Sequence, residues 1–268
     1  MMQASSQNIS CQMNRYDFGT ESLCWWYPRV KQLCVPQPKT FIIHLDQDEF
    51  AQFAFLNRDL PESFVVNLFR HACVLGYPVF LRTDITAFKQ AWERSCFVRC
   101  ESLLLRNLQN LLRYSFLIGD CKFQTKAAVL REYLPLLSHF SCYSGGLPVC
   151  TEMRYFVSSG EVLCRHPYWT AEMVHNPDCD DWRKKLEKAN RVNRADILQL
   201  DSVAHRVAGL FREHELAIDF VKTKNDVWYL IDIAPAEHSY RPVPDCPQCS
   251  PGYAHYREQG FGYRGQRL

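Results

Sequence analysis

The stretch "DFVKTKNDVWYLIDIAPAEHSY", residues 219–240, holds two acidic residues in the most strand-like part of the chain. Asp219 follows one apolar run, and Asp232 interrupts another. Asn225 and Asp226 lie between the two runs, and residues of these types tolerate the backbone of a tight turn. The spacing therefore predicts a β-hairpin with one carboxylate on each strand.

The register of this hairpin sets the two carboxylates against each other. Pairing around the turn places Phe220 opposite Ile231 and Asp219 opposite Asp232. Opposed Cβ atoms of antiparallel strands are about 4.5–5.5 Å apart, so two charges there repel each other unless a cation lies between them. Mg²⁺ suits such a pair, because it prefers oxygen ligands and completes its shell with phosphate and water. Two solvent-facing acids on an edge hairpin are the alternative.

The composition is that of a soluble globular protein. The chain has 268 residues, of which 47% are hydrophobic and 22% charged, which is enough for one large domain or two modest lobes. Its net charge of +2 predicts neither a nucleic-acid partner nor attraction to a membrane surface. No apolar run approaches the roughly 20 residues that a bilayer span needs, and the first residues lack the pattern of a secretory signal.

Cysteine usage indicates the redox environment. The 13 cysteines are odd in number and scattered through apparently buried segments, which predicts reduced thiols in the cytoplasm. Cys246 and Cys249 have the spacing of a zinc knuckle, but no second pair matches it, so a Pro-rich loop is the alternative. Residues 246–268 are rich in Gly, Tyr and Arg and are expected to form a C-terminal tail.

Helical and strand-like patterns alternate irregularly along the chain. Helical apolar spacing covers residues 64–76, 102–117 and 180–212, whereas strand patterns cover residues 41–45, 77–84, 126–137 and 147–169. Because this order lacks the regular spacing of a doubly wound sheet, we expect an α+β fold.

Basic residues near the strands are further candidates for a site. Arg82 ends a strand and Lys89 follows in a polar loop, an arrangement that suits phosphate binding. Arg154 and Arg165 lie on the two strands of "TEMRYFVSSGEVLCRHPYW". A turn at the two serines pairs Glu152 with Arg165, so a salt bridge is the alternative explanation of Arg165.

Four motifs, in this order, resemble those of the ATP-grasp superfamily, and most closely a clade of short ATP-grasp proteins, many of them from bacteriophages. They are "PVFLRTDITAFKQAW", "REYLPL", "LPVCTEMRYFVSSGEVLCRHPYW" and "AIDFVKTKNDVWYLIDIAPAEHSY". The resemblance covers about residues 77–245 and implies two α+β lobes that clamp a nucleotide. It divides the chain into a pre-ATP-grasp segment, an N-lobe, a C-lobe with the metal site and a tail, at residues 1–76, 77–135, 136–245 and 246–268.

The resemblance also implies which residues bind ATP. In ATP-grasp enzymes a basic residue after a strand and another in the following loop hold the α and β phosphates, and Arg82 and Lys89 are similar. The hinge between the lobes binds adenine through its backbone, and Glu132, Tyr133 and Leu134 are similar to it.

At the reacting end, the resemblance implies catalytic roles for two arginines and metal-binding roles for two acids. Arg154 and Arg165 are similar to the arginines that face the γ-phosphate and the activated substrate. Asp219 and Asp232 match the ligands of Mg²⁺, so ATP and Mg²⁺ are the implied cofactors.

Three departures from the family pattern weaken parts of this site. Ala234 stands where many ATP-grasp proteins have an asparagine ligand, and Ala217 stands where many have an arginine. The segment "TDITAFK" also lacks the glycines of the phosphate flap. The second metal position therefore has one ligand fewer.

The usual reaction of the family joins a carboxylate to an amine through an acyl phosphate, with small molecules or peptides as substrates. The resemblance leaves two other functions open. One is a nucleotide-binding assembly chaperone or protein-binding module related to the cell-division-cycle protein 123 family, which implies a protein partner. The other is an ATP-dependent phosphotransferase. A viral source would place the protein in the host cytoplasm.

Overall fold

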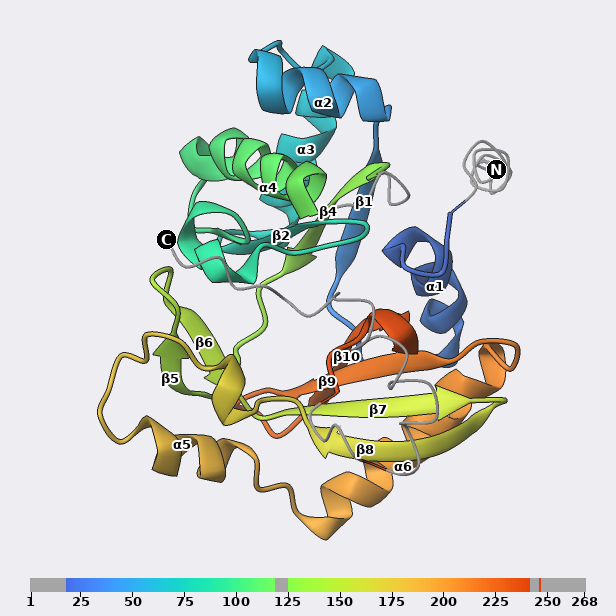
Figure 1. Cartoon of the computed structure of the whole chain (residues 1–268). Coiled ribbons are helices and arrows are strands. Elements are labelled where there is room, and N and C mark those ends of the chain that lie inside the picture. The colour runs from blue at the N-terminus through green and yellow to red at the C-terminus, as the bar shows by residue number, and fades with distance from the viewer. Residues whose placement is uncertain (1–17, 119–124, 242–245, 247–268) are drawn as a thin grey trace, which may run out of the picture.

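The computed structural model describes residues 18–118, 125–241 and 246, and it arranges them in two lobes (Figure 1). The N-lobe, drawn uppermost, contains a four-stranded antiparallel sheet with the order β1-β4-β2-β3. Its strands are β1 (Thr40–His44), β2 (Val79–Thr83), β3 (Phe97–Val98) and β4 (Ala127–Glu132). The helices that share its core are α2 (Gln47–Leu56), α3 (Glu62–Leu75) and α4 (Leu104–Ile118).

The C-lobe contains a second four-stranded antiparallel sheet, with the order β10-β9-β7-β8. Its strands are β7 (Glu152–Ser158), β8 (Glu161–Pro167), β9 (Leu216–Lys222) and β10 (Trp228–Pro235). The same lobe includes the hairpin of β5 (Ser138–Cys142) and β6 (Leu147–Cys150), with α1 (Leu23–Val30), α5 (Trp182–Ala189) and α6 (Arg194–Leu210). Short 3₁₀ helices span Lys31–Leu33, Lys89–Arg94, Glu101–Leu103, Ala171–Met173 and Ala236–His238. The predicted α+β class is confirmed.

The periodicities of α6 and β7 account for the larger part of the C-lobe core. On α6 the buried residues recur at helical spacing: Leu200, Val203, Ala204 and Val207. They share a core with the alternate residues of β7, namely Met153, Tyr155 and Val157. Because successive strand residues point to opposite faces, the intervening residues of β7 face away from α6, toward the N-lobe.

The expected boundary at residue 76 does not separate two parts of this structure. β1 pairs with β4 in the N-lobe sheet, and α2 and α3 contribute to the same core as α4. Without β1, β4 would be an unpaired edge of the sheet. The residues from β1 to α3 therefore belong to the N-lobe, whereas α1 packs in the core of the C-lobe.

The hairpin at the C-terminal end of the sheet has the predicted carboxylate pair. Asp232 is the register partner of Asp219 on β9. Phe220, however, pairs with Leu230 and not with Ile231, because the register shifts between Leu230 and Asp232. A bulge of this kind inserts one residue into one strand only.

Among the described cysteines, none forms a disulfide. Among the described helices, none combines the length and apolar character that crossing a bilayer requires. Of the expected C-terminal tail, only Cys246 lies within the described residues, and it is buried.

Candidate functional site

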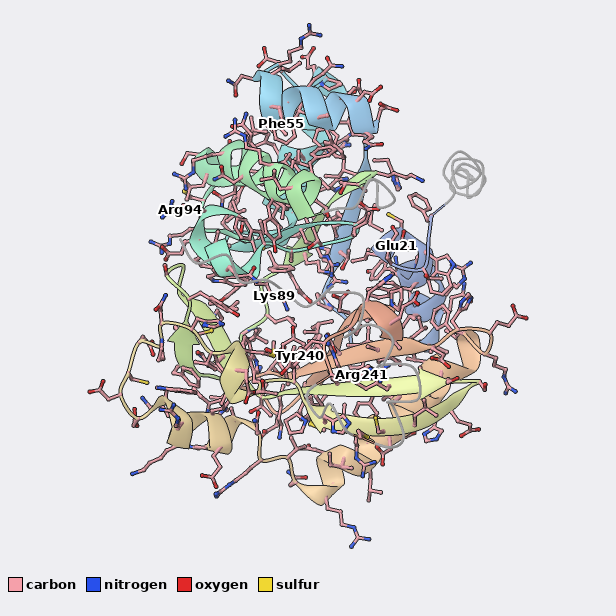
Figure 2. All side chains as sticks on the ribbon, viewed as in Figure 1. Glu21, Phe55, Lys89, Arg94, Tyr240 and Arg241 are labelled. Atoms are coloured by element: carbon pink, nitrogen blue, oxygen red, sulfur yellow. The ribbon has the colours of Figure 1, made fainter. Side chains whose placement is uncertain are left out.

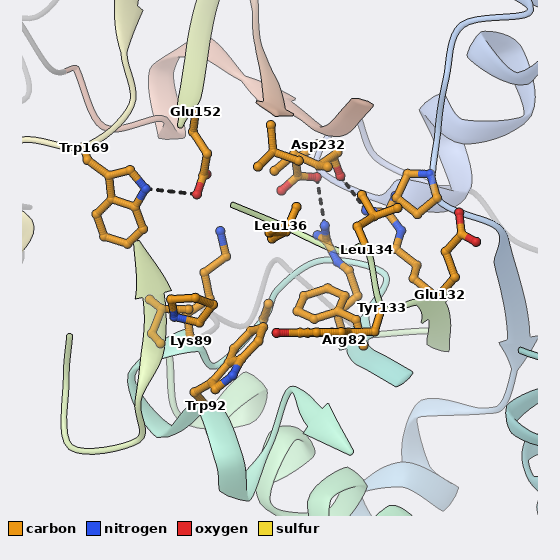
Figure 3. Close-up of a pocket in the computed structure, with 18 residues that line it drawn as sticks. Arg82, Lys89, Trp92, Glu132, Tyr133, Leu134, Leu136, Glu152, Trp169 and Asp232 are labelled. Carbon is orange, nitrogen blue, oxygen red and sulfur yellow. Dashed lines mark hydrogen bonds and ion pairs between the residues drawn. The ribbon is translucent and has the colours of Figure 1, made fainter. Parts of the chain in front are cut away.

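A pocket with about 790 Å³ of empty space, its open mouth included, lies between the two lobes (Figure 3). Small-molecule sites occur preferentially at such junctions. Both sheets and the segment that joins them contribute to its wall, which includes Phe80, Arg82, Lys89, Trp92, Arg131, Glu132, Tyr133, Leu134, Glu152, Trp169 and Asp232. Six of the predicted site residues thus meet in one cavity: Arg82, Lys89, Glu132, Tyr133, Leu134 and Asp232.

One end of the pocket is the segment that follows β4. The Glu132 side chain accepts a hydrogen bond from the backbone N–H of Lys39 (2.9 Å) and so anchors this segment to the chain before β1. The Leu134 carbonyl accepts from Leu136 (2.8 Å), but the Leu134 N–H has no acceptor among the described residues. Because Leu134 is buried, its N–H favours a ligand atom that accepts a hydrogen bond.

Aromatic rings form the wall beside this segment. The ring centroids of Phe80 and Trp92 are 5.7 Å apart, and those of Trp92 and Tyr133 are 6.4 Å apart. A flat apolar group that enters the pocket here meets ring faces and edges on the N-lobe side. The combination of aromatic wall and backbone donor suits a heterocyclic base.

Arg82 places a buried cation on the pocket wall. Its Nε donates to the Thr83 carbonyl (3.0 Å), and its Nη1 donates to Asp232 Oδ1 (2.9 Å). These two bonds fix the guanidinium at the end of β2, as predicted for a phosphate-binding residue. They also link the N-lobe to β10 of the C-lobe.

Lys89 begins a 3₁₀ helix at the boundary between the lobes (Figure 2), and its ammonium points toward Glu152 (Figure 3). No described carboxylate lies within 4.0 Å of its Nζ, which is 5.4 Å from the ring centroid of Tyr168. The negative potential of Tyr168, followed by that of Glu152, raises the pKa of Lys89 although burial opposes it. The residue therefore presents a full positive charge without a directly bonded partner in the described part of the chain.

Arg131 is a third cation in the pocket, and sequence analysis did not include it. One of its amino groups donates to the Ile231 carbonyl, but its Nε has no hydrogen-bond partner among the described residues. Burial, followed by repulsion from Arg82, lowers its pKa to about 9. A buried guanidinium with an unpaired donor favours an anion nearby. The available signal was a basic residue inside the otherwise apolar strand "AAVLRE".

Asp232 is the predicted metal ligand that lines the pocket, and its side chain is 31% exposed. Its Oδ1 accepts from Arg82 and from the backbone N–H of Ile233 (3.2 Å). Burial alone would raise the pKa of Asp232, but the charges of Arg82 and Arg131 outweigh it and hold the pKa below its usual range. The pocket therefore contains an ionised carboxylate.

Asp219, its partner in the hairpin, has different surroundings. Both of its oxygens accept hydrogen bonds from Arg154, Nε to Oδ1 and Nη2 to Oδ2, each at 2.7 Å. Burial alone would lower the pKa of Arg154, but Asp219 outweighs it and raises the pKa. The guanidinium carbon lies 4.7 Å from the ring centroid of Tyr168, and Nη1 donates to the Tyr240 carbonyl (2.8 Å). The repulsion expected between the two acids is thus relieved by two arginines, one on each acid.

Arg165 does not reach the pocket. It is opposite Tyr155 on β7, whose side chain lies in the core with α6, and its Nη1 is 3.4 Å from Asp201 of that helix. The predicted pairing of Arg165 with Glu152 is wrong. The observed register differs from the predicted one by three residues, and an odd shift moves a side chain to the other face of a sheet.

Glu152 lies in the pocket, where Trp169 Nε1 donates to its Oε1 (2.9 Å). Burial raises its pKa to about 6, although the charge of Lys89 and this hydrogen bond oppose the shift. Its carboxyl group therefore changes charge near neutral pH. Sequence analysis considered Glu152 only as a partner of Arg165.

Residues 44–257 match the model of an ATP-grasp domain family, the one numbered family 3 within its clade, and this match covers most of the 268 residues. The chain belongs to this ATP-grasp family. The ATP-grasp fold implied by the motifs is confirmed.

No curated protein has a matching sequence. Among solved structures, C-terminally truncated Cdc123 from Schizosaccharomyces pombe superposes on this ATP-grasp chain with a TM-score of 0.55 and 15% identity, over 82% of this chain and 88% of that one. A second structure of Cdc123 from Schizosaccharomyces pombe superposes with a TM-score of 0.53 and 16% identity, over 80% of this chain and 83% of that one. At these identities the likeness establishes a common fold.

Proposed function

We propose that this ATP-grasp protein binds ATP with Mg²⁺ in the pocket between its lobes and uses it to join a carboxylate to an amine. The observation that carries the proposal is the convergence of Arg82, Lys89 and Arg131 on one cavity. Lys89 Nζ and Arg131 Nε lack direct partners among the described residues. A polyphosphate supplies the anionic oxygens that such donors require.

The other end of the pocket suits adenine. The aromatic wall of Phe80, Trp92 and Tyr133 provides contacts for the ring system. The Leu134 N–H lies where a ring nitrogen would accept a hydrogen bond. ATP bound in this orientation extends from the hinge toward Lys89 and Asp232.

The residues for Mg²⁺ fit in part. Asp232 is ionised and lines the pocket, which suits an oxygen ligand of a hard cation. Asp219 is the weaker ligand, because Arg154 bonds both of its oxygens and neutralises its charge. Ala234 adds no ligand. When bound, Mg²⁺ neutralises charge on the β and γ phosphates.

The proposed reaction has two displacements. A carboxylate oxygen of the first substrate attacks the γ-phosphorus, the bond to the β-γ bridging oxygen breaks, and ADP leaves. The amine nitrogen then attacks the acyl carbon, the bond to the phosphate oxygen breaks, and inorganic phosphate leaves as the nitrogen loses a proton to solvent. Lys89 and Arg131 stabilise charge on the transferring group, and Arg154 borders this end of the site.

A second candidate is a nucleotide-binding module for a protein partner with little turnover. The observation that favours it is the sealed Asp219–Arg154 pair, together with the missing ligand at Ala234, since both reduce the capacity for a second metal ion. Such a protein binds Mg-ATP without needing the complete catalytic set.

The deciding experiment measures ADP formation by the full chain with Mg-ATP and libraries of carboxylates and amines, with products identified by mass spectrometry. A ligase forms ADP, phosphate and an amide only when both substrates are present. A phosphotransferase forms ADP and a phosphorylated product with one substrate. Tight Mg-ATP binding without any product supports the second candidate, and absence of ATP binding overturns both proposals.

A further inference from the structure

Three side chains of the metal-ligating type gather on the C-lobe, away from the residues assigned to the nucleotide. The ligand atoms of Cys164, His166 and Cys246 all lie within 4.8 Å of one another. His166 Nε2 is 3.2 Å from Cys164 Sγ. Cys246 is buried, and the other two side chains are half-buried.

The fold brings these residues together from two distant segments. Cys164 and His166 are alternate residues of β8, so they point to the same face of the sheet. Their partners on β7 are Phe156 and Arg154, which places both ligands on the face directed away from α6. Cys246 follows β10 and packs with Phe156 in a small apolar core.

The chemistry of this set is that of a structural zinc site. Two thiols and an imidazole are soft-to-borderline ligands that select Zn²⁺ over Mg²⁺. Zn–S and Zn–N bonds of about 2.3 and 2.0 Å in a tetrahedron separate the ligand atoms by roughly 3.5–3.8 Å. The observed spacing reaches this range through small side-chain rotations. Burial, followed by the charge of Arg241, lowers the pKa of His166, which favours the neutral imidazole that binds metals.

We propose that Cys164, His166 and Cys246 bind one zinc ion, which fastens the chain after β10 to the outer strand β8. The residues between them cross the sheet beside Arg154: the Tyr240 carbonyl accepts from Arg154, and the Tyr240 hydroxyl is 3.1 Å from Thr170 Oγ1. Figure 2 shows Tyr240 and Arg241 over the C-lobe sheet. The ion therefore holds in place the segment that borders the Arg154 end of the pocket.

The fourth position of the tetrahedron is not assigned. Cys249 stands three residues after Cys246, which is a ligand spacing of structural zinc sites, but it lies outside the described residues. The three described ligands carry the inference by themselves.

The test uses the full chain, purified with reductant, stripped with a chelator and then titrated with Zn²⁺ or Co²⁺ alone. We expect one ion per chain. Co²⁺ should give the thiolate-to-metal charge-transfer band and the intense visible bands of a tetrahedral site, and Zn²⁺ should raise the melting temperature. Cys164→Ser, His166→Ala and Cys246→Ser should each weaken binding by more than about tenfold, because even residues outside the ligand set cost that much in metal sites.

Two kinds of variant make the result specific. His166→Cys replaces one ligand with another and should keep the metal and the thiolate bands. Cys100→Ser and His175→Ala, both exposed and outside the cluster, should bind as the unmodified protein does. Circular dichroism confirms that each variant is folded.

Three results would overturn the inference. The first is a reduced, folded protein that binds neither Zn²⁺ nor Co²⁺ at one equivalent. The second is equal loss of binding in the control variants. The third is a Cys164–Cys246 disulfide in protein purified without reductant together with no metal binding after reduction, which would assign the cluster to a redox link.

Discussion

Asp219 and Asp232 are register partners in one hairpin, yet they differ in almost every physical respect. Asp219 is sealed by a two-point ion pair with Arg154, and the two side chains are 8% and 9% exposed. Asp232 has a single ion-pair contact with Arg82 and is 31% exposed on the pocket side. The first arrangement holds the sheet together, whereas the second leaves a carboxylate available to a ligand.

The largest expected effect follows from breaking the sealed pair. Asp219→Asn removes the charge that compensates buried Arg154, so the free energy of unfolding should fall by about 3–5 kcal/mol. Asp232→Asn should cost less than about 1 kcal/mol, because a partly exposed pair is worth little. Urea unfolding of both variants without ligand measures the difference. Equal losses would show that the two acids have the same structural role.

The accessible half of the comparison is tested through its ligand. Lys89→Met should weaken Mg-ATP binding by about 1–3 kcal/mol, the range for a charge-assisted hydrogen bond. Isothermal titration calorimetry measures the change. The control is Arg99→Met, which removes an exposed cation paired with Glu93 and should leave ATP affinity unchanged. Unchanged affinity in a folded Lys89→Met protein would remove this residue from the site.

Glu152 extends the comparison to pH. Its folded pKa, about 6, lies above the ordinary value of 4.5. For an acid with a raised pKa, its contribution to stability is fully present below about pH 4.5 and is lost as the pH rises through about 6. Glu152→Gln keeps an acceptor for Trp169 and should therefore be more stable than the unmodified protein by about 1–2 kcal/mol above pH 7, with little difference at pH 4.

Denaturant titrations of both proteins across this pH range measure the Glu152 effect. Trp169→Phe serves as a second variant: it removes one bond that favours the ionised form, so the unmodified protein's loss of stability with rising pH should become steeper. Parallel stability curves for the Gln variant and the unmodified protein would contradict the assignment of this titration to Glu152.

The smallest effect is expected at Arg165, outside the pocket. Its contact with Asp201 is long and partly exposed, so Arg165→Ala should change the free energy of unfolding by less than about 1 kcal/mol. ATP affinity and any turnover should be unaffected, whereas Arg154→Met should alter both stability and the site. A loss of turnover in folded Arg165→Ala would restore the catalytic role that the motif resemblance implies.

Local chemistry made much of this molecule predictable. The apolar periods indicated α4, α6 and the β7–β8 hairpin, and the turn-forming pair after β9 indicated that Asp219 and Asp232 face each other. These features depend on residues close together in the chain. The order of the motifs then indicated the ATP-grasp fold and the hinge after β4.

Only the tertiary structure decided what each charged side chain contacts. Arg154 and Arg82 come from distant segments to bond the two acids, and Arg131 enters the pocket because β4 lies between β1 and β2. Arg165 faces the helix because an odd register shift reverses a strand's faces, and no short-range pattern shows such a shift. The sequence by itself determined the elements and the opposed carboxylates; long-range pairing determined which carboxylate is sealed and which remains open to a ligand.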